Sequence, residues 1–129
     1  MSSIFSKIIS GEIPAHKIGE NDRFLAFLDI TPLQHGHTLV IPKEEVDYIF
    51  DMDDELLADM MVFAKQCAVR IKSAFPCRKV GVAVVGLEVP HAHIHLVPIN
   101  AVSDMNFSRE KMKLTQEELA QDAEKIRNS

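Results

Sequence analysis

Residues 91–98 read His-Ala-His-Ile-His-Leu-Val-Pro, so histidine and apolar residues alternate strictly over the first six positions. Side chains of a β-strand point to opposite faces in turn, because the strand repeats every two residues. We therefore expect an extended segment with His91, His93 and His95 on one face and the apolar residues between them on the other. Half of the six histidines of the chain lie within these five positions. This concentration indicates a functional row of imidazoles rather than a chance cluster.

The remaining strand signals come from short runs of alternating or apolar residues separated by turn residues. The segments 16–18 and 23–29 flank a Glu-Asn-Asp turn, which predicts a hairpin. A further strand is predicted at 37–41, where Pro42 ends it. The run 79–85 is predicted to be a buried strand that precedes the histidine segment.

Three helices are predicted from capping residues and helical periodicity. Ser3 is a suitable N-cap for a short first helix that ends near Gly11 and Pro14. An apolar stripe from Asp53 to Phe75 indicates a long helix, which Asp51 or Asp53 could cap and Pro76 ends. Residues 115–118, Thr-Gln-Glu-Glu, fit a capping box for a last helix that runs to about Arg127. Residues 101–114 show no regular pattern. This order predicts an α+β fold in which the long helix packs across the sheet.

Length and composition limit the classes of function. A chain of 129 residues suits a single domain, and a net charge of −5 argues against a broad nucleic-acid surface. No apolar run approaches the roughly 18–20 residues that span a bilayer, and residues 1–14 lack an apolar run of signal-peptide length. Cys67 and Cys77 show no paired-ligand spacing, which indicates neither a disulfide nor a zinc site. We expect a cytoplasmic protein with no membrane partner.

A metal site is one possible use of the histidine row. Imidazoles two residues apart on a strand stand about 6.6–6.8 Å apart and can share a zinc ion, whereas the outer pair is about 13 Å apart. All three rings therefore cannot bind one tetrahedral ion. A metal site would need a distant ligand such as His37 or Asp29 and would leave one histidine of the row unused.

Nucleophilic catalysis uses all three rings. A neutral imidazole attacks phosphorus well, and crowded imidazoles lower one another's pKa, which keeps the attacking ring uncharged. A flanking ring that becomes protonated can stabilise phosphate charge or protonate a leaving group. His93 is the expected nucleophile, because it alone has a histidine neighbour on both sides. His16 and His35 are interpreted as structural.

The histidine segment resembles the His-φ-His-φ-His-φ-φ signature of the histidine triad (HIT) superfamily, where φ is an apolar residue. Three further segments, 4–15, 26–32 and 36–43, resemble the Hint branch of that superfamily in order and spacing. The resemblance implies a five-stranded antiparallel sheet with helices, usually in a homodimer. It also implies hydrolysis of purine nucleoside phosphoramidates or related nucleotides through a nucleotidylated middle histidine, with no cofactor. Residues 1–100 would form the HIT domain and residues 101–129 a C-terminal extension with the terminal helix.

The resemblance also assigns roles to individual residues. His93 resembles the nucleophile, His91 and His95 its flanking partners, and His37 the histidine that supports the phosphate site. Asp29 resembles the carboxylate that accepts both ribose hydroxyls, although taken alone it could also be a turn residue before Thr31 and Pro32. An apolar slot for the base is implied at Ile4, Phe5, Ile8 and Phe27, although for Ile8 and Phe27 a place in the ordinary core is the stronger interpretation. Histidine rather than glutamine at position 95 resembles the hydrolase branch and not the nucleotidyltransferases.

Three departures from the family pattern bear on function. Many bacterial members carry cysteine ligands of a zinc site where Ser3 and Ser6 stand here, and because hydroxyls are poor zinc ligands we predict no metal. The loop 86–90 is shorter and more apolar than is usual for the branch, and Glu88, which we place beside the nucleotide, would repel phosphate if it pointed inward. The polar tail after residue 100 is expected to wrap a dimer partner or to border the pocket. A weakly catalytic nucleotide-binding or signalling module and a histidine-ligated metal protein are the competing functions.

Overall fold

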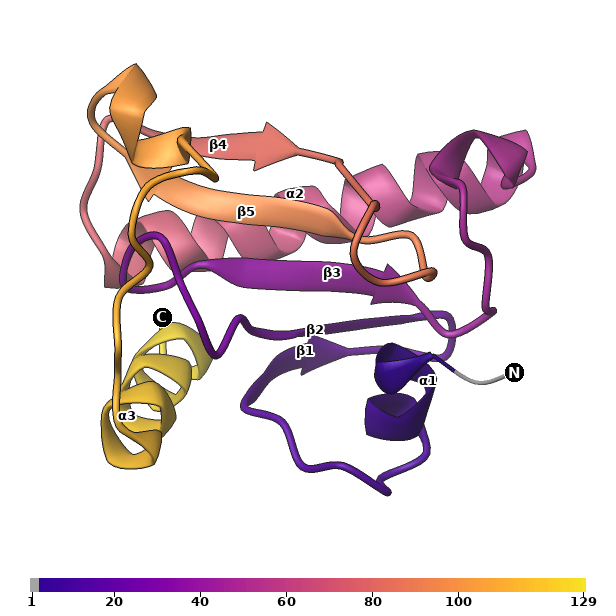
Figure 1. Ribbon diagram of the computed structural model, residues 1–129, viewed down its shortest axis with the longest axis horizontal. Coiled ribbons are helices and arrows are strands. Elements are labelled where there is room, and N and C mark those ends of the chain that lie inside the picture. The colour runs from indigo at the N-terminus through magenta and orange to yellow at the C-terminus, as the bar shows by residue number, and fades with distance from the viewer. Residues whose placement is uncertain (1–2) are drawn as a thin grey trace.

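Five antiparallel strands form a single sheet in the computed structural model, which describes residues 3–129 (Figure 1). The first two residues of the predicted domain 1–100 lie outside the described residues. The strand order across the sheet is β1-β2-β3-β5-β4, which can be followed from the labels in Figure 1. The strands are β1 (Lys17–Glu20), β2 (Phe24–Leu28), β3 (Thr38–Pro42), β4 (Lys79–Ala83) and β5 (Ile94–Ile99). The predicted α+β fold with a five-stranded antiparallel sheet is confirmed.

The register of the central strands places the histidine segment beside β3. The β1–β2 turn is closed by Asn21, whose Oδ1 accepts hydrogen bonds from the backbone N–H groups of Arg23 and Phe24 at 2.9 and 2.8 Å. Farther along the sheet, Phe27 pairs with Leu39, and Leu39 pairs with His95 on its other side. Side chains of directly paired residues lie on the same face of a sheet. Phe27, Leu39 and His95 therefore share one face.

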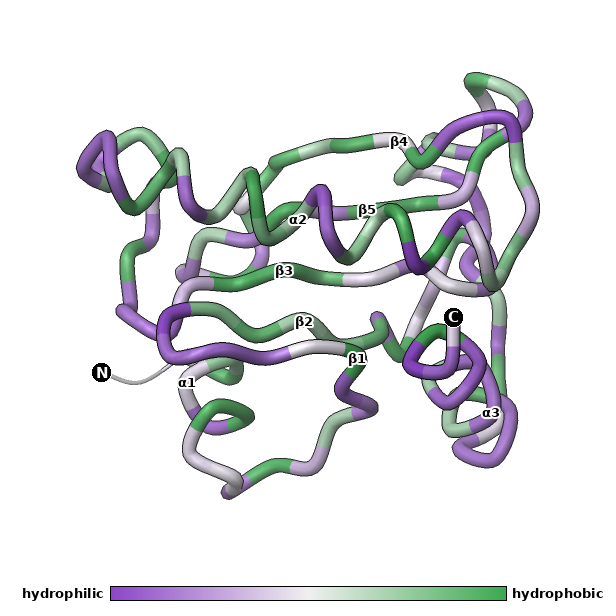
Figure 2. Tube along the Cα trace, turned by 180° about the vertical axis from the view of Figure 1, so that it is seen from behind, coloured by the Kyte–Doolittle hydropathy of each residue, from purple (hydrophilic) through white to green (hydrophobic). Residues whose placement is uncertain are grey.

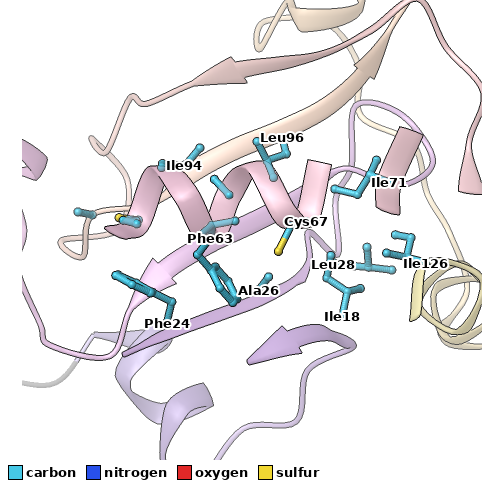
Figure 3. Packing of buried hydrophobic residues seen from close by; sticks show 14 of the residues in the cluster. Ile18, Phe24, Ala26, Leu28, Phe63, Cys67, Ile71, Ile94, Leu96 and Ile126 are labelled. Atoms are coloured by element: carbon cyan, nitrogen blue, oxygen red, sulfur yellow. The ribbon is translucent and has the colours of Figure 1, made fainter. Parts of the chain in front are cut away.

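Helix α2 (Asp54–Ala74) covers the opposite face of the sheet (Figures 1 and 3). Asp53 caps it by accepting a 2.8 Å hydrogen bond from the Leu56 N–H, as predicted. Viewed from the side of α2, the chain is continuously hydrophobic along β2 and much of β3 (Figure 2). The core between α2 and the sheet includes Ile18, Phe24, Ala26, Leu28, Val40, Met60, Phe63, Cys67, Ile71, Ala92, Ile94 and Leu96.

The other two helices have different positions. The short α1 (Ile4–Ile9) is capped by Ser3 and lies on the face away from α2. It packs there in a second apolar cluster that comprises Phe5, Ile8, Leu25, Phe27, Leu39 and Ile41. Helix α3 (Gln116–Arg127) begins with the predicted capping box at Thr115 and adds Leu119, Ala123 and Ile126 to the core shared with α2. Within residues 3–129, no helix is both long enough and apolar enough to span a membrane.

Two predictions about the strands are wrong. Strand β5 begins at Ile94, so His91, which lies in a bend, and His93 both precede the strand. The strand does not extend back to His91, because the Ala92 N–H bonds at 2.6 Å to the carbonyl of Val46, a residue that follows the end of β3. The segment 79–85 is not buried, because β4 is an edge strand whose residues are intermediate or exposed. Two short 3-10 turns, at Ile49–Asp51 and Val102–Met105, complete the structure.

Candidate active site

A pocket of about 450 Å³ opens beside α1, on the face of the sheet away from α2. Its walls come from α1, the ends of β2 and β3, the loop before the histidine segment, and the tail after β5. Every predicted site residue except His91 lines this pocket. Those residues are Ile4, Phe5, Ile8, Phe27, Asp29, His37, Glu88, His93 and His95.

The alternation of residues 91–96 sorts their side chains between the core and the pocket. The apolar residues of the segment, Ala92, Ile94 and Leu96, are at most 1% exposed and pack in the core with α2. The rings of His93 and His95 face the pocket, with their centroids 5.0 Å apart. Burial of the apolar residues thus fixes the segment from behind and leaves the two imidazoles at the pocket wall.

The proton position on His93 is set by the backbone. His93 Nδ1 lies 2.7 Å from the carbonyl oxygen of His91. A carbonyl oxygen can only accept, so Nδ1 carries the proton and donates this bond. In the neutral ring Nε2 is then unprotonated and keeps its lone pair. His93 therefore presents a nucleophilic nitrogen.

A second chain of hydrogen bonds fixes the protons of His37 and His95. The Leu33 N–H donates to His37 Nδ1 at 3.0 Å, and His37 Nε2 lies 2.9 Å from His95 Nδ1. Burial lowers the pKa of both rings to about 4, so both are neutral at pH 7. His37 must then hold its proton on Nε2 and donate it to His95 Nδ1. His95 holds its own proton on Nε2, on the other side of its ring, and can donate it to a phosphoryl oxygen.

These lowered pKa values predict a pH-dependent stability. Between pH 6.5, the usual pKa, and about pH 4, the unfolded chain binds protons that folded His37 and His95 do not. The free energy of unfolding should therefore fall with decreasing pH across this window, with a slope that approaches about 1.4 kcal/mol per pH unit for each ring once the unfolded ring is fully protonated. Urea unfolding from pH 6.5 to 5 measures the slope. His95→Gln should make it clearly shallower and the control His16→Gln should not; equal slopes in wild type and His95→Gln would contradict the assignment.

His91 lies behind the pocket and holds α1 in place. Its Nε2 donates to the Pro42 carbonyl at 2.8 Å, so its Nδ1 accepts from the Ser3 hydroxyl at 2.9 Å. Ser3 Oγ in turn accepts from the Ser6 N–H at 3.0 Å, which is the N-cap bond of α1. Glu45 Oε1 accepts from both the Ser3 N–H and the Ser6 hydroxyl. Ser3 and Ser6 thus form a hydrogen-bonded cluster with His91 and Glu45, while the carbonyl of His91 orients His93.

The apolar end of the pocket lies against His93. The Phe5 ring contacts the His93 ring at a centroid distance of 5.0 Å and the Phe27 ring at 5.5 Å, both edge to face. Phe5, Ile8 and Phe27 are each less than 10% exposed, so they belong to the core and to the pocket wall at once. Ile4 is half exposed and lies at the mouth. These side chains can hold a flat, apolar group such as a base.

One carboxylate oxygen of Asp29 stabilises a turn, and the other is available to a ligand. Its Oδ1 accepts from the backbone N–H of Thr31 at 2.9 Å and from the Thr31 hydroxyl at 3.1 Å. Its Oδ2 lies 3.7 Å from His37 Nε2, beyond hydrogen-bond distance. Both interpretations made from the sequence are compatible with this geometry, because the turn occupies one oxygen and leaves the other toward the pocket.

The short loop 86–90 forms the outer rim. Leu87 is 88% exposed, and Glu88 is also exposed although it lines the pocket. An exposed carboxylate on the rim is hydrated and screened, so it opposes phosphate binding weakly.

Two lining residues, Phe107 and Lys111, were not predicted from the sequence. The Phe107 ring packs against His95 at a centroid distance of 4.7 Å, and Lys111 lies nearby in the pocket wall. Both belong to the irregular tail after β5. No periodic pattern marks them, and hydrogen bonds from the tail to the loop 32–34 hold them at the site. The tail therefore borders the pocket, which was one of the two expectations for it.

Asp29, His37 and His95 form a possible metal-binding group, with one ligand atom of each within 4.8 Å of the others. The hydrogen bonds argue against this use. His37 Nδ1 already accepts the Leu33 N–H, so Nε2 carries the ring proton and has no lone pair for a metal. The geometry fits a neutral hydrogen-bond chain better than a metal site.

The family comparison agrees with the fold and the histidine row. Residues 10–102 match the model of the HIT domain, which covers more than half of the chain. The chain belongs to the histidine triad (HIT) superfamily. An uncharacterized HIT-like protein of Borreliella burgdorferi is 37% identical over 113 residues, which cover 82% of this chain and 81% of that protein.

Two further relatives extend the comparison. The adenosine 5′-monophosphoramidase of Saccharomyces cerevisiae is 41% identical over 96 residues, 74% of this chain and 61% of that protein. The crystal structure of a Hit-like protein from Bartonella henselae, described as involved in cell-cycle regulation, superposes with a TM-score of 0.85. It is 32% identical, and the match covers 98% of this chain and 95% of that one. The family thus includes proteins named as nucleotide phosphoramidases.

Proposed function

We propose that this protein hydrolyses purine nucleoside phosphoramidates or related nucleotides through a covalent nucleotidyl-histidine. The observation that carries the proposal is the hydrogen bond from His93 Nδ1 to the His91 carbonyl, which leaves the Nε2 lone pair at the pocket wall. An activated nucleophile of this kind divides one difficult displacement into two easier ones. The neutral state of the neighbouring His95 and His37 keeps positive charge away from that lone pair.

The proposed reaction has two displacements at the α-phosphorus. His93 Nε2 forms a bond to phosphorus, and the bond to the leaving nitrogen breaks; that nitrogen keeps the electron pair and takes a proton from water in the pocket. A second water then attacks the same phosphorus and gives a proton to the hydroxide left by the first step; the bond to His93 breaks, and the nucleoside monophosphate is released. His95 Nε2–H donates to the phosphoryl oxygens as charge develops, and His37 holds His95 in that tautomer.

The rest of the pocket supplies groups for the nucleoside. The apolar slot of Ile4, Phe5, Ile8 and Phe27 fits the base, and Asp29 Oδ2 can accept from ribose hydroxyls. Incubation with adenosine 5′-phosphoramidate should release adenosine monophosphate, detected by chromatography. Activity should persist in a chelator, because no step uses a metal. Absence of the monophosphate at micromolar enzyme would overturn the proposal.

A nucleotide-binding or signalling module is the second candidate function. It is favoured by the apolar loop 86–90, in which Pro90 lacks an N–H donor and Glu88 carries a negative charge. Tight binding of adenosine monophosphate in calorimetry, together with no turnover of the phosphoramidate, would identify the module. Stoichiometric metal in the purified protein, with loss of activity on chelation, would instead identify a metal protein.

We also propose that the protein forms a homodimer through β4. This strand lies at an edge of the sheet, and three apolar side chains on it or just after it, Val82, Val84 and Val85, are 41–53% exposed. Exposed apolar edge strands promote pairing with another chain. Light scattering should show a dimer for wild type and a monomer for Val82→Glu. Gln121→Glu, which adds the same charge on α3, should stay dimeric; a dimeric Val82→Glu protein or a monomeric wild type would contradict this interface.

A further inference from the structure

The pocket contains one permanent positive charge, supplied by the tail. Among the residues that the structure describes around the pocket, Lys111 is the only lysine or arginine. The neighbouring rings of His37 and His95 are neutral, and Asp29 and Glu88 are acidic. Lys111 is half-buried, so its charge is less screened by solvent than that of an exposed lysine. An anion that enters this part of the pocket would therefore meet a single cation.

The tail is fastened to the loop that supports His37. Arg109 donates through Nη2 to the Leu33 carbonyl and, at 3.2 Å, to Gln34 Oε1. The Met112 N–H donates to the Pro32 carbonyl at 2.8 Å. Figure 1 shows this orange stretch descending past the connection between β2 and β3 on its way to α3. Lys111 lies between these two attachments, so its backbone is fixed relative to the histidines.

Two hydrogen bonds orient the ammonium group of Lys111, and they use two of its three donors. Its Nζ donates to the carbonyl oxygens of Phe107 and Arg109. An ammonium group has three donors, so one remains for a ligand. Lys111 lines the same pocket as His37 and His95, and its positive charge adds to the burial that lowers the pKa of His37. Lys111 therefore combines a fixed position, a free donor and proximity to the phosphate site.

A series of ring contacts leads from the base slot to Phe107, whose carbonyl oxygen accepts a hydrogen bond from Lys111 Nζ. Phe5 contacts His93, His93 contacts His95, and His95 contacts Phe107, with successive centroid distances of 5.0, 5.0 and 4.7 Å. With the base against Phe5 and the α-phosphorus at His93, the substituent beyond the phosphorus extends toward His95 and the tail.

We infer that Lys111 is a specificity-determining residue that selects substrates whose leaving group carries a negative charge. This inference rests on the proposed function and specifies its substrate class: adenosine 5′-phosphoramidates of amines that bear a carboxylate or a phosphate. The chemistry is unchanged, because His93 displaces the amine nitrogen in either case. Lys111 binds the remote anionic group of the amine, which a neutral alkylamine lacks.

The test compares two substrates with leaving groups of similar size, one anionic and one neutral: the adenosine 5′-phosphoramidates of glycine and of propylamine. Wild type should prefer the glycine compound. Lys111→Gln should lower kcat/KM for it by about tenfold or more, as expected for loss of a charge-assisted hydrogen bond, and change the propylamine compound by less than about threefold. Lys111→Arg should retain the preference. Lys113→Gln, which removes an exposed lysine two residues farther along the tail, is the matched control and should resemble wild type.

The outcomes separate this inference from the proposed function. Equal losses on both substrates, or no loss on either, would overturn the role of Lys111 while leaving hydrolysis intact. If wild type hydrolyses neither compound, the proposed function fails, and calorimetry with the two intact compounds then tests Lys111 alone. Weaker binding of only the glycine compound by Lys111→Gln would still support selection of the anionic group; equal affinities in wild type and variant would overturn it.

Discussion

His93→Ala should lower kcat for adenosine 5′-phosphoramidate by at least about 1,000-fold, because it removes the nitrogen that forms the covalent bond. The affinity for adenosine monophosphate should change by only a few-fold, since the base slot and Asp29 remain. Steady-state kinetics measures the first quantity and calorimetry the second. The fold should persist, because the side chain of His93 faces the pocket rather than the core with α2.

His16→Ala is the matched control for this change. His16 hydrogen-bonds Gln116 of α3 at 2.8 Å and does not line the pocket, so its loss should leave kcat within about twofold. If His93→Ala retained more than a tenth of the wild-type rate, His93 could not be the nucleophile. If it lost nucleotide binding as well, the assignment of separate base and phosphate regions would be wrong.

Ile94→Ala should be the most destabilising single change in the histidine segment. Ile94 is fully buried and packs in the core beneath α2, so truncation removes buried apolar surface and leaves a cavity. Changes of this kind cost about 2–5 kcal/mol of unfolding free energy. Urea unfolding at pH 7 gives the difference, and an unchanged slope of free energy against urea would show that the change acts on stability.

The control for Ile94 is Val69→Ala on the outer surface of α2, where the side chain is 63% exposed. We expect a change within about 0.5 kcal/mol there. Together with His93→Ala, these variants test the alternation of the segment, because His93 should affect catalysis and its neighbour Ile94 should affect stability. A loss of unfolding free energy as small as that of Val69→Ala would mean that the buried apolar face of the segment does not hold the histidines in place.

The alternation of residues 91–96 predicted that Ala92, Ile94 and Leu96 enter the core, but it did not predict that His91 lies buried behind the pocket, apart from His93 and His95. It could not predict where the strand begins, because the Ala92 N–H bonds to Val46, a partner 46 positions earlier that no local pattern reveals. The edge position of β4 was missed for a related reason. A run rich in valine is typical of a buried strand, but neighbours in the sheet decide whether it is covered.

The same limit applies to the site. His37, Asp29 and the apolar slot could be placed by resemblance, because their spacing within the motifs is characteristic. The proton positions could not, since they depend on the carbonyl of His91 and the N–H of Leu33. Lys111 could not be found either. The role that we infer for it depends on how an irregular tail attaches to the loop 32–34, and composition carries no signal for that contact.

The most direct test of the covalent mechanism is the stereochemical course at the α-phosphorus. A substrate with a chiral phosphorothioate at that position, hydrolysed in isotopically labelled water, reports the number of displacements. Two in-line displacements, the first by His93 and the second by water, predict net retention of configuration. Net inversion would show that water attacks the substrate directly, and it would contradict a nucleotidyl-histidine intermediate.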